Sequence, residues 1–133
     1  EALDRATAAG KLAEGKFDYS VVLSDDSVRF ASGKAVLTDA GKARLTQLAD
    51  QLKADNKNVY LEIQGYTDST GTDDINYRLG QERADHVRRF LNQQGVSLNR
   101  MSSISYGSEQ PVAPNDTAEG RSANRRVVIV VLS

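Results

Sequence analysis

The chain of 133 residues contains no cysteine, no long hydrophobic run and no strong excess of charge of either sign. The absence of cysteine excludes disulfides, thiol catalysis and cysteine-ligated metal sites. The net charge is −1, with Lys and Arg scattered along the chain, so the basic stripe that nucleic-acid binders need is missing. No apolar run approaches the roughly 20 residues that a membrane-spanning helix requires. No signal peptide is visible, so we expect any export signal to lie outside this chain or to have been removed.

The composition that is present suits one folded domain. Hydrophobic residues make up 39% and charged residues 26%, as in ordinary soluble globular proteins. A chain of this length buries roughly two-thirds of its unfolded surface, which is enough for a core of its own. Residues 1–18 are rich in alanine and charge and are broken by Gly10 and Gly15, which predicts a linker or short helix. We expect the domain itself to span residues 19–133.

Strands are indicated by short runs rich in β-branched and aromatic residues. Residues 19–30 predict a hairpin or one bulged strand, because a polar turn interrupts the apolar positions. Apolar and polar residues alternate from Val59 to Gln64, which predicts a half-buried strand. Two further strands are predicted at 101–106 and 127–132, and the continuous apolar run of the last one favours an interior position in the sheet.

Two long helices are predicted between these strands. One follows Thr38, a residue that can cap a helix, and carries leucines at helical spacing. The other begins at a cap provided by Thr72 or Asp73 and extends to about Gln93. Residues 107–123 are predicted as a long polar loop, which is either functional or mobile. The order β(β)-α-β-α-β-β predicts an α/β (α+β) fold, a two-layer sandwich with both long helices on one face of a mixed β-sheet.

The second helix carries two polar residues on its apolar face. At 100° per residue, Asn76 lies at the centre of the stripe that includes Ala84 and Val87, and Arg83 also lies within this stripe. A buried guanidinium needs an anion, because burying an unpaired charge is costly. Two alternatives remain open for Arg83. It has a structural role, as a salt bridge to an internal carboxylate or as a side chain that extends past the edge of the core to water. Otherwise it binds a ligand carboxylate through two parallel hydrogen bonds.

An acidic side chain follows the strand predicted at 59–64. Asp68 lies in segment 65–71, past the strand end where α/β sheets tend to bind ligands, and small residues around it allow close approach to the backbone. The structural alternative is an Asx-turn that only shapes the loop. If Asp68 and Arg83 face each other across a gap, they suit a ligand end that bears both an ammonium and a carboxylate.

These residues resemble the signature of a known family. The segments 65–71 and 79–84 are similar to those of the OmpA-like C-terminal domain, a family that includes peptidoglycan-associated lipoproteins and the periplasmic domains of flagellar motor stators. Residues 30–38 look like the family's first strand-to-helix junction, and parts of 111–127 look like its closing loop and last strand. The resemblance spans about residues 19–132 and rests on separated motifs in the family's order.

The resemblance implies non-covalent binding of peptidoglycan through the diaminopimelate of its stem peptide. It implies that Asp68 holds the ammonium of diaminopimelate and that Arg83 holds its carboxylate. Further residues that match positions in or beside the family's pocket are Asn76, Thr67, Leu79, Phe30 and Ala31. No cofactor or metal is implied. We expect a periplasmic domain that binds peptidoglycan, with other envelope proteins as further candidate partners. Its attachment to the outer membrane is expected to run through regions outside this chain.

Two positions depart from the family pattern. Tyr66 stands where many members have histidine, and Gly80 stands where serine is usual. We expect the first to alter packing behind the loop and the second to open space near the pocket. Three further matches, Arg121, Arg125 and Arg126, are interpreted mainly as structural ion pairs that hold the long loop to the last strand. Contact with glycan or a partner protein is the alternative for these arginines.

The residue pattern gives no support for catalysis. His86 is the only histidine, it has no HxxxH or HExxH companion, and a surface or boundary position is expected for it. Asp73 and Asp74 are interpreted as first-turn carboxylates that favour the helix dipole. Segment 65–71 lacks the Gly-Lys-Ser/Thr ending of a phosphate-binding loop. We therefore predict a binding module, and the alternative is an assembly or stator-type domain with weak or absent peptidoglycan binding.

Overall fold

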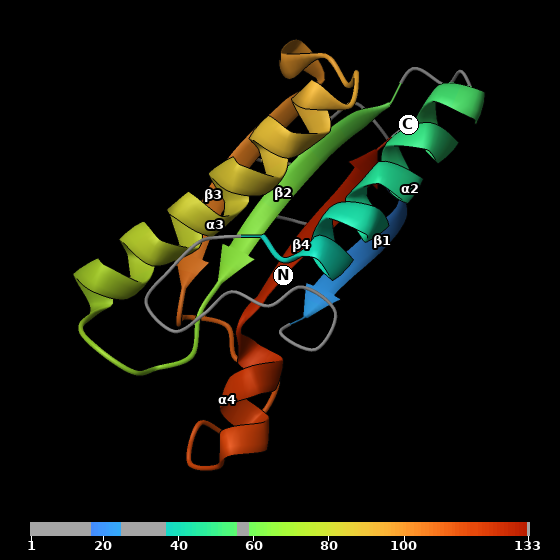
Figure 1. Cartoon of the computed structure of the whole chain (residues 1–133). Helices are drawn as coiled ribbons and strands as arrows, with labels where there is room; N and C mark the ends of the chain where they lie inside the picture. The colour runs from blue at the N-terminus through green and yellow to red at the C-terminus, as the bar shows by residue number, and fades with distance from the viewer. Residues whose placement is uncertain (1–16, 25–36, 56–58, 133) are drawn as a thin grey trace.

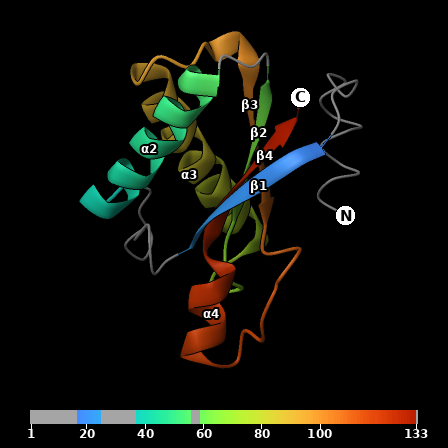
Figure 2. The same cartoon turned by 90° about the vertical axis from the view of Figure 1, so that its right-hand side faces the viewer.

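The computed structural model describes residues 17–24, 37–55 and 59–132. Two long helices, α2 (Asp39–Asp55) and α3 (Asp73–Gln93), cover one face of a four-stranded sheet (Figures 1 and 2). The strands are β1 (Phe17–Ser24), β2 (Tyr60–Tyr66), β3 (Met101–Gly107) and β4 (Arg126–Leu132). A 3-10 turn, η1 (Leu98–Arg100), and a short helix, α4 (Ala118–Asn124), complete the described elements. The predicted two-layer α+β sandwich is confirmed.

The sheet is mixed, with the strand order β1-β4-β2-β3. Strands β2 and β3 run parallel, and α3 connects them, as a parallel pair requires a long crossover. Strand β4 lies antiparallel between β1 and β2. It therefore has the interior position that its continuous apolar sequence predicts.

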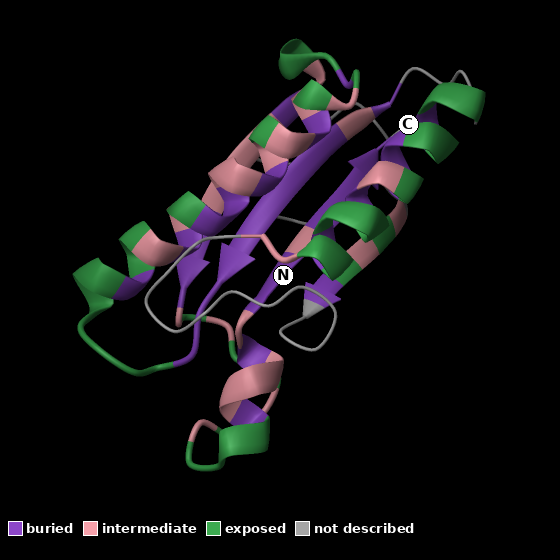
Figure 3. Cartoon of the chain, in the orientation of Figure 1, coloured by how far each residue is buried: buried purple, intermediate pink, exposed green. Residues whose placement is uncertain are grey.

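The hydrophobic core lies between the two long helices and the sheet. The helices contribute mainly leucine, alanine and valine, and the strands contribute leucine, isoleucine and valine: Leu45, Leu48, Leu52, Ala84, Val87, Leu91, Leu61, Ile63, Val127, Ile129 and Val131. Figure 3 shows the outward sides of both helices largely exposed and the strands largely buried. Both helix caps form, because Thr38 Oγ1 accepts the Gly41 amide hydrogen and Thr72 Oγ1 accepts that of Ile75.

Strand β2 differs from its prediction, because both of its faces are buried. Glu62 and Gln64, on the face opposite the helices, are 1% and 0% exposed. The Gln64 amide donates to Glu62 Oε2, and the Tyr66 hydroxyl donates to Gln64 Oε1. Apolar and polar residues alternate along β2 because one buried face is apolar and the other buried face is polar. The polar face tolerates burial because its side chains form hydrogen bonds with one another. The strand also extends past its predicted end, to Tyr66.

The segment predicted as a loop at 107–123 contains the helix α4. Thr117 caps it, with Oγ1 accepting the Gly120 amide hydrogen at 2.9 Å. The sequence pattern missed this helix because glycine disfavours helix interiors. Glycine is required at position 120, since a Cβ there would overlap with the carbonyl oxygen of Pro114. Helix α4 lies beyond the end of the sheet, directly before β4 (Figure 1).

Gly80 does not open space near the pocket, so that prediction is wrong. A Cβ on Gly80 would overlap with the Ser105 hydroxyl, and a Cβ on Gly65 would overlap with the Gly80 carbonyl. The two glycines instead let α3 approach β2 and β3 closely, and the space is filled. Gly80 therefore contributes to packing between helix and sheet.

Several predictions concern residues outside the described ranges. The linker predicted at 1–18 overlaps the described residues only at its end, where β1 begins at Phe17. The second half of the predicted hairpin at 19–30 also lies outside them. Within the described ranges, no helix is long and apolar enough to cross a bilayer.

Candidate ligand-binding site

A cavity of about 360 Å³ lies where the loop after β2, the first half of α3 and the end of α4 meet. Its lining combines residues from all three segments: Thr67, Asp68, Thr70, Gly71, Ile75, Asn76, Leu79, Arg83, Arg121 and Arg125. All the predicted site residues from Thr67 onward are thus brought together in one place. Phe30 and Ala31, predicted as part of the wall, lie outside the described residues. The volume is at the lower end of the range for ligand pockets, which suits a small ligand or the end of a larger one.

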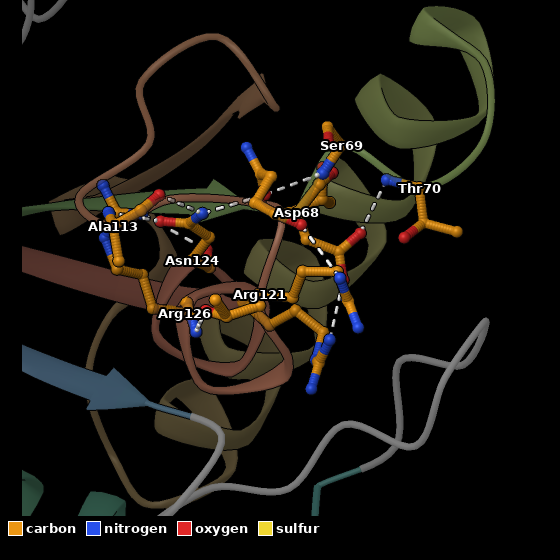
Figure 4. A network of polar contacts seen from close by, with 12 residues as sticks. Asp68, Ser69, Thr70, Ala113, Arg121, Asn124 and Arg126 are labelled. Carbon is orange, nitrogen blue, oxygen red and sulfur yellow. Dashed lines mark hydrogen bonds and ion pairs between the residues drawn. The ribbon is translucent and has the colours of Figure 1, made fainter.

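Asp68 is held in position by two partners. The Thr70 amide donates to Asp68 Oδ1 at 2.8 Å, which is the Asx-turn that the sequence left open (Figure 4). Arg125 Nη1 forms an ion pair with Asp68 Oδ2 at 2.6 Å. Asp68 therefore shapes its loop and also lines the cavity. An ionised carboxylate has about four acceptor positions, so these two bonds leave room for a further donor.

The environment of Asp68 favours its ionised form. Burial alone would raise the pKa of Asp68, but the hydrogen bonds from Thr70 and Arg125, together with the charge of Arg125, outweigh it. The pKa of this carboxyl therefore lies below its usual value. The cavity wall carries a fixed negative charge at neutral pH, as an ammonium-binding site requires.

Arg83 places a positive charge in the interior of the molecule. It lies on the sheet-facing side of α3, as the helical pattern predicts, and its side chain is among the largest that are fully buried. Only 1% of Arg83 is exposed, yet it lines the same cavity as Asp68. An arginine keeps its proton on burial, so this charge is permanent. Its planar fork can accept a carboxylate through two parallel hydrogen bonds.

Asn76 provides a neutral donor beside these charges. It is 3% exposed, and its Nδ2 amide has no hydrogen-bond partner among the residues that the structure describes. Leaving a buried donor unsatisfied costs about 1–3 kcal/mol, which a ligand oxygen in the cavity would offset. Leu79 and Ile75 give this side of the cavity an apolar wall, although Ile75 is 52% exposed. Ile75 was not predicted from the sequence as a site residue, because it lies outside the apolar stripe of α3.

Two of the arginines interpreted as structural also line the cavity. Arg121 Nη1 donates to the Asn115 carbonyl at 2.9 Å, so it does hold the long loop, through a carbonyl and not through a carboxylate. Arg125 instead pairs with Asp68, in the loop after β2. Among the described residues, the lining thus contains three guanidinium groups, including that of Arg83, and one carboxylate.

A network of side-chain amides connects the two loops that form the cavity (Figure 4). The buried Asn124 donates to the Ala113 carbonyl and to Asn115 Oδ1, each at 2.9 Å. Asn115 Oδ1 also accepts the Ser69 amide hydrogen, next to Asp68. The positions of Asp68 and Arg121 are therefore coupled through hydrogen bonds and do not depend on the ion pair alone.

Three other polar residues considered in the sequence, His86, Asp73 and Asp74, are not among the described residues that line this cavity. His86 is partly buried at a separate surface pocket between α2 and α3, which agrees with the expected boundary position. Asp73 and Asp74 are exposed in the first turn of α3. Across residues 17–24, 37–55 and 59–132, no three side chains of the metal-ligating kinds come together.

Comparison with known proteins gives consistent matches. The model of the OmpA family matches residues 29–125. The chain is 39% identical to "Probable lipoprotein YiaD" of Escherichia coli over 128 residues. This alignment covers 96% of the chain and 58% of the lipoprotein. It is 40% identical over 104 residues to "Peptidoglycan-binding protein ArfA" of Mycobacterium tuberculosis, covering 78% of this chain and 32% of that protein. The chain therefore spans less than two thirds of the length of either relative.

A solved structure gives the same match in three dimensions. The peptidoglycan-associated lipoprotein from Burkholderia pseudomallei superposes with a TM-score of 0.70 at 36% sequence identity. The match covers 86% of this chain and 90% of that one. The chain and this lipoprotein domain therefore share most of their fold.

Proposed function

The chain belongs to the OmpA family, and from this membership we propose that it binds peptidoglycan non-covalently and anchors an envelope structure to the cell wall. Two similar proteins support the proposal, since one is named as a peptidoglycan-binding protein and the other as a peptidoglycan-associated lipoprotein. The proposal makes the domain a binding module of the periplasm and not an enzyme.

The ligand group of this proposal is the zwitterionic end of diaminopimelate. Asp68 receives its ammonium, Arg83 receives its carboxylate, and the Asn76 amide donates to a ligand oxygen. The observation that carries this assignment is that Asp68 and Arg83 line one small cavity with opposite charges. Thr67 and Leu79 complete the contact surface, with Leu79 against the alkyl chain of the ligand.

The expected affinity for a single ligand end is modest. Each charge-assisted hydrogen bond contributes about 1.5–3 kcal/mol net, and the entropy of association opposes binding. A dissociation constant roughly in the micromolar to millimolar range follows. Firm attachment then comes from many domains binding one polymer, which raises the effective concentration.

Retention on purified sacculi tests cell-wall binding. The wild-type domain should be retained, and Asp68→Ala should not, because the ammonium loses its anion. The matched control is Asp116→Ala, which removes an exposed carboxylate from the loop before α4 and should leave retention unchanged. Equal retention of wild type and Asp68→Ala, or none for either, would contradict the proposal and favour an assembly or stator-type domain.

Calorimetry with two stem tripeptides tests the diaminopimelate assignment separately. One peptide carries diaminopimelate at its third position, and the other carries lysine, which has the distal ammonium but no distal carboxylate. Binding of the lysine peptide should be about tenfold weaker or worse, since Arg83 loses its partner. Equal affinities for the diaminopimelate and lysine peptides would contradict the assignment of diaminopimelate. They would leave the proposal of cell-wall binding unaffected.

A further inference from the structure

The loop that carries Asp68 is held by hydrogen bonds more than by burial. Asp68 itself is only 8% exposed, but the four residues that follow it, 69–72, are all exposed and are small or polar. A segment with few buried apolar contacts opens easily unless hydrogen bonds hold it. The orientation of the Asp68 carboxylate therefore depends on the hydrogen bonds that this loop makes.

One of these bonds connects the loop to a segment far away in the sequence. Asn115, in the loop before α4, accepts the Ser69 amide hydrogen on Oδ1 at 3.2 Å. Ser69 lies between Asp68 and Thr70, whose amide donates to Asp68 Oδ1 at 2.8 Å (Figure 4). Asn115 thus holds the middle of the turn that orients this carboxylate. Asn115 is itself not among the described residues that line the cavity, so it acts on the site through Ser69.

The side chain of Asn124 determines which way the Asn115 amide points. Asn124 is fully buried, and its Oδ1 accepts the backbone amide hydrogens of Val112 and Ala113 at 2.8 and 3.0 Å. Its Nδ2 therefore faces the Ala113 carbonyl and the Asn115 side chain. Only an oxygen can accept a hydrogen bond from this Nδ2 and another from the Ser69 amide. The Asn115 carboxamide is thus fixed with its oxygen toward Ser69.

The main chain of Asn115 is also held. Its carbonyl accepts a hydrogen bond from Arg121 Nη1 at 2.9 Å. Both the side chain and the main chain of Asn115 are therefore bonded to α4, the helix that precedes β4. Asn115 transmits the position of this helix to the loop after β2.

We propose, on the basis of the proposed function, that Asn115 is a positioning residue for binding of the ligand ammonium. It fixes Ser69, and thereby keeps the Asp68 carboxylate in the orientation that receives the ammonium. When the binding-competent arrangement of a site is only partly populated, the apparent affinity falls by that fraction. Loss of the Asn115 acceptor therefore weakens binding of a ligand that carries the ammonium and has little effect on a ligand that lacks it.

The test combines three variants with two ligands. Asn115→Ala removes the acceptor, and Asn115→Asp keeps it, because a carboxylate oxygen can accept both hydrogen bonds. Asn99→Ala is the matched control, since the exposed Asn99 also accepts a hydrogen bond on Oδ1, from the Ser97 hydroxyl, but lies in η1 before the start of β3. The ligands are the diaminopimelate tripeptide and the same peptide with the distal amine of diaminopimelate acetylated, which removes the ammonium.

Chemical-shift titration measures the affinities, because it detects weak binding. Wild type, Asn99→Ala and Asn115→Asp should bind the free peptide at least about tenfold more tightly than the acetylated one. Asn115→Ala should bind the free peptide about fivefold more weakly than wild type does, and the acetylated peptide equally well. Urea denaturation checks that each variant is folded. If Asn115→Ala is unfolded, Asn115→Ser takes its place, since its hydroxyl is too short to reach the Ser69 amide.

The outcomes separate the positioning role from the function on which it rests. Unchanged affinity for the free peptide in Asn115→Ala would overturn the positioning role and leave peptidoglycan binding intact. Equal losses for both peptides, or an Asn115→Asp variant as weak as Asn115→Ala, would assign Asn115 to general loop support and also overturn it. Absence of binding by the wild type would contradict the proposed function itself, and the positioning role with it.

Discussion

Two clusters of buried polar residues lie on or next to strand β2. One is on its outer face, the face opposite the helices, and the other follows the end of the strand. On the outer face, Glu62, Gln64 and Tyr66 are connected to one another by hydrogen bonds. At the end, Asp68 and Arg83 line a cavity of about 360 Å³. Buried polar groups that satisfy each other stabilise a fold, whereas charges that face a cavity can be used by a ligand. The comparison predicts that changes in the first group affect stability and changes in the second affect binding.

Two adjacent arginines at the start of β4 also differ in this way, one with a structural role and the other at the cavity. The Arg126 guanidinium packs over the Tyr66 ring, 3.8 Å from its centroid, and donates to the Gln110 carbonyl. It thus connects the long loop to β4 through a carbonyl and an aromatic ring, where an ion pair was predicted. Arg125 is the neighbouring residue and lines the cavity, paired with Asp68. Successive side chains of an extended chain point to opposite sides, so one residue separates a structural role from a site role.

The largest expected effect is on stability, from Tyr66→Ala on the outer face of β2. Tyr66 is 2% exposed and stacks on Tyr106 with ring centroids 5.2 Å apart. Its truncation should lower the free energy of unfolding by about 3–5 kcal/mol, because a large buried ring leaves a cavity. Urea denaturation measures this. Tyr77→Ala removes a half-exposed ring and serves as the control. It should change the free energy of unfolding by only about 0.5 kcal/mol or less. A similar loss of stability in both variants would contradict the structural role given to the outer face of β2.

The second effect is on binding, from Arg83→Lys at the cavity. Lysine keeps the charge and loses the two-pronged contact with the ligand carboxylate, which should weaken binding of the diaminopimelate tripeptide by about 10- to 100-fold. Calorimetry measures the affinity, with Arg78→Lys, an exposed arginine of the same helix, as control. Unchanged affinity in Arg83→Lys would show that its planar fork does not hold the ligand.

The third change concerns the close contact between α3 and the sheet. Gly80→Ala should destabilise the domain by about 1–3 kcal/mol, because its Cβ overlaps with the Ser105 hydroxyl. The double variant Gly80→Ala/Ser105→Ala should lose less stability than the sum of the two single variants, which a double-mutant cycle measures. Affinity for the tripeptide should stay the same in each. Reduced affinity at unchanged stability would instead assign Gly80 to the pocket.

The smallest expected effect depends on pH and involves Glu62. Burial raises the pKa of Glu62, although hydrogen bonds from Gln64 and Tyr106 lower it in part. Since the folded-state pKa lies above the unfolded value, the ionised form of Glu62 reduces stability at neutral pH. Glu62→Gln should therefore be slightly more stable than wild type near pH 7. Thermal melts should show the advantage disappear as the pH falls below the usual glutamate value of 4.5, and a variant that is less stable at every pH would contradict this.

The sequence predicts most of the fold because its signals are local. Hydrophobic periodicity, the caps at Thr38 and Thr72 and the apolar run of β4 each depend on neighbours along the chain. Helix α4 was missed because its glycine has a tertiary cause, the close approach of the Pro114 carbonyl. The burial of Glu62 was missed for a similar reason, since strand alternation does not reveal what covers the second face of a sheet.

The site could be predicted only in part. A helical wheel identifies Arg83 and Asn76 as polar residues on a buried face, and both line the cavity. The pairing of Asp68 with Arg125 joins residues far apart in the sequence, and no local pattern indicates it. The roles of Asp68 and Arg83 toward a ligand remain predictions that rest on family resemblance and on their shared cavity.

Amide chemical-shift mapping with the diaminopimelate tripeptide tests the central claim most directly. The account predicts saturable shifts of the backbone amides of Thr67, Thr70 and Gly71 and of the Asn76 side-chain amide, all at the cavity. The side-chain amide of Gln64, in the self-satisfied group on β2, should hardly move. Shifts centred on Gln64 and the outer face of β2, with the cavity unaffected, would contradict it.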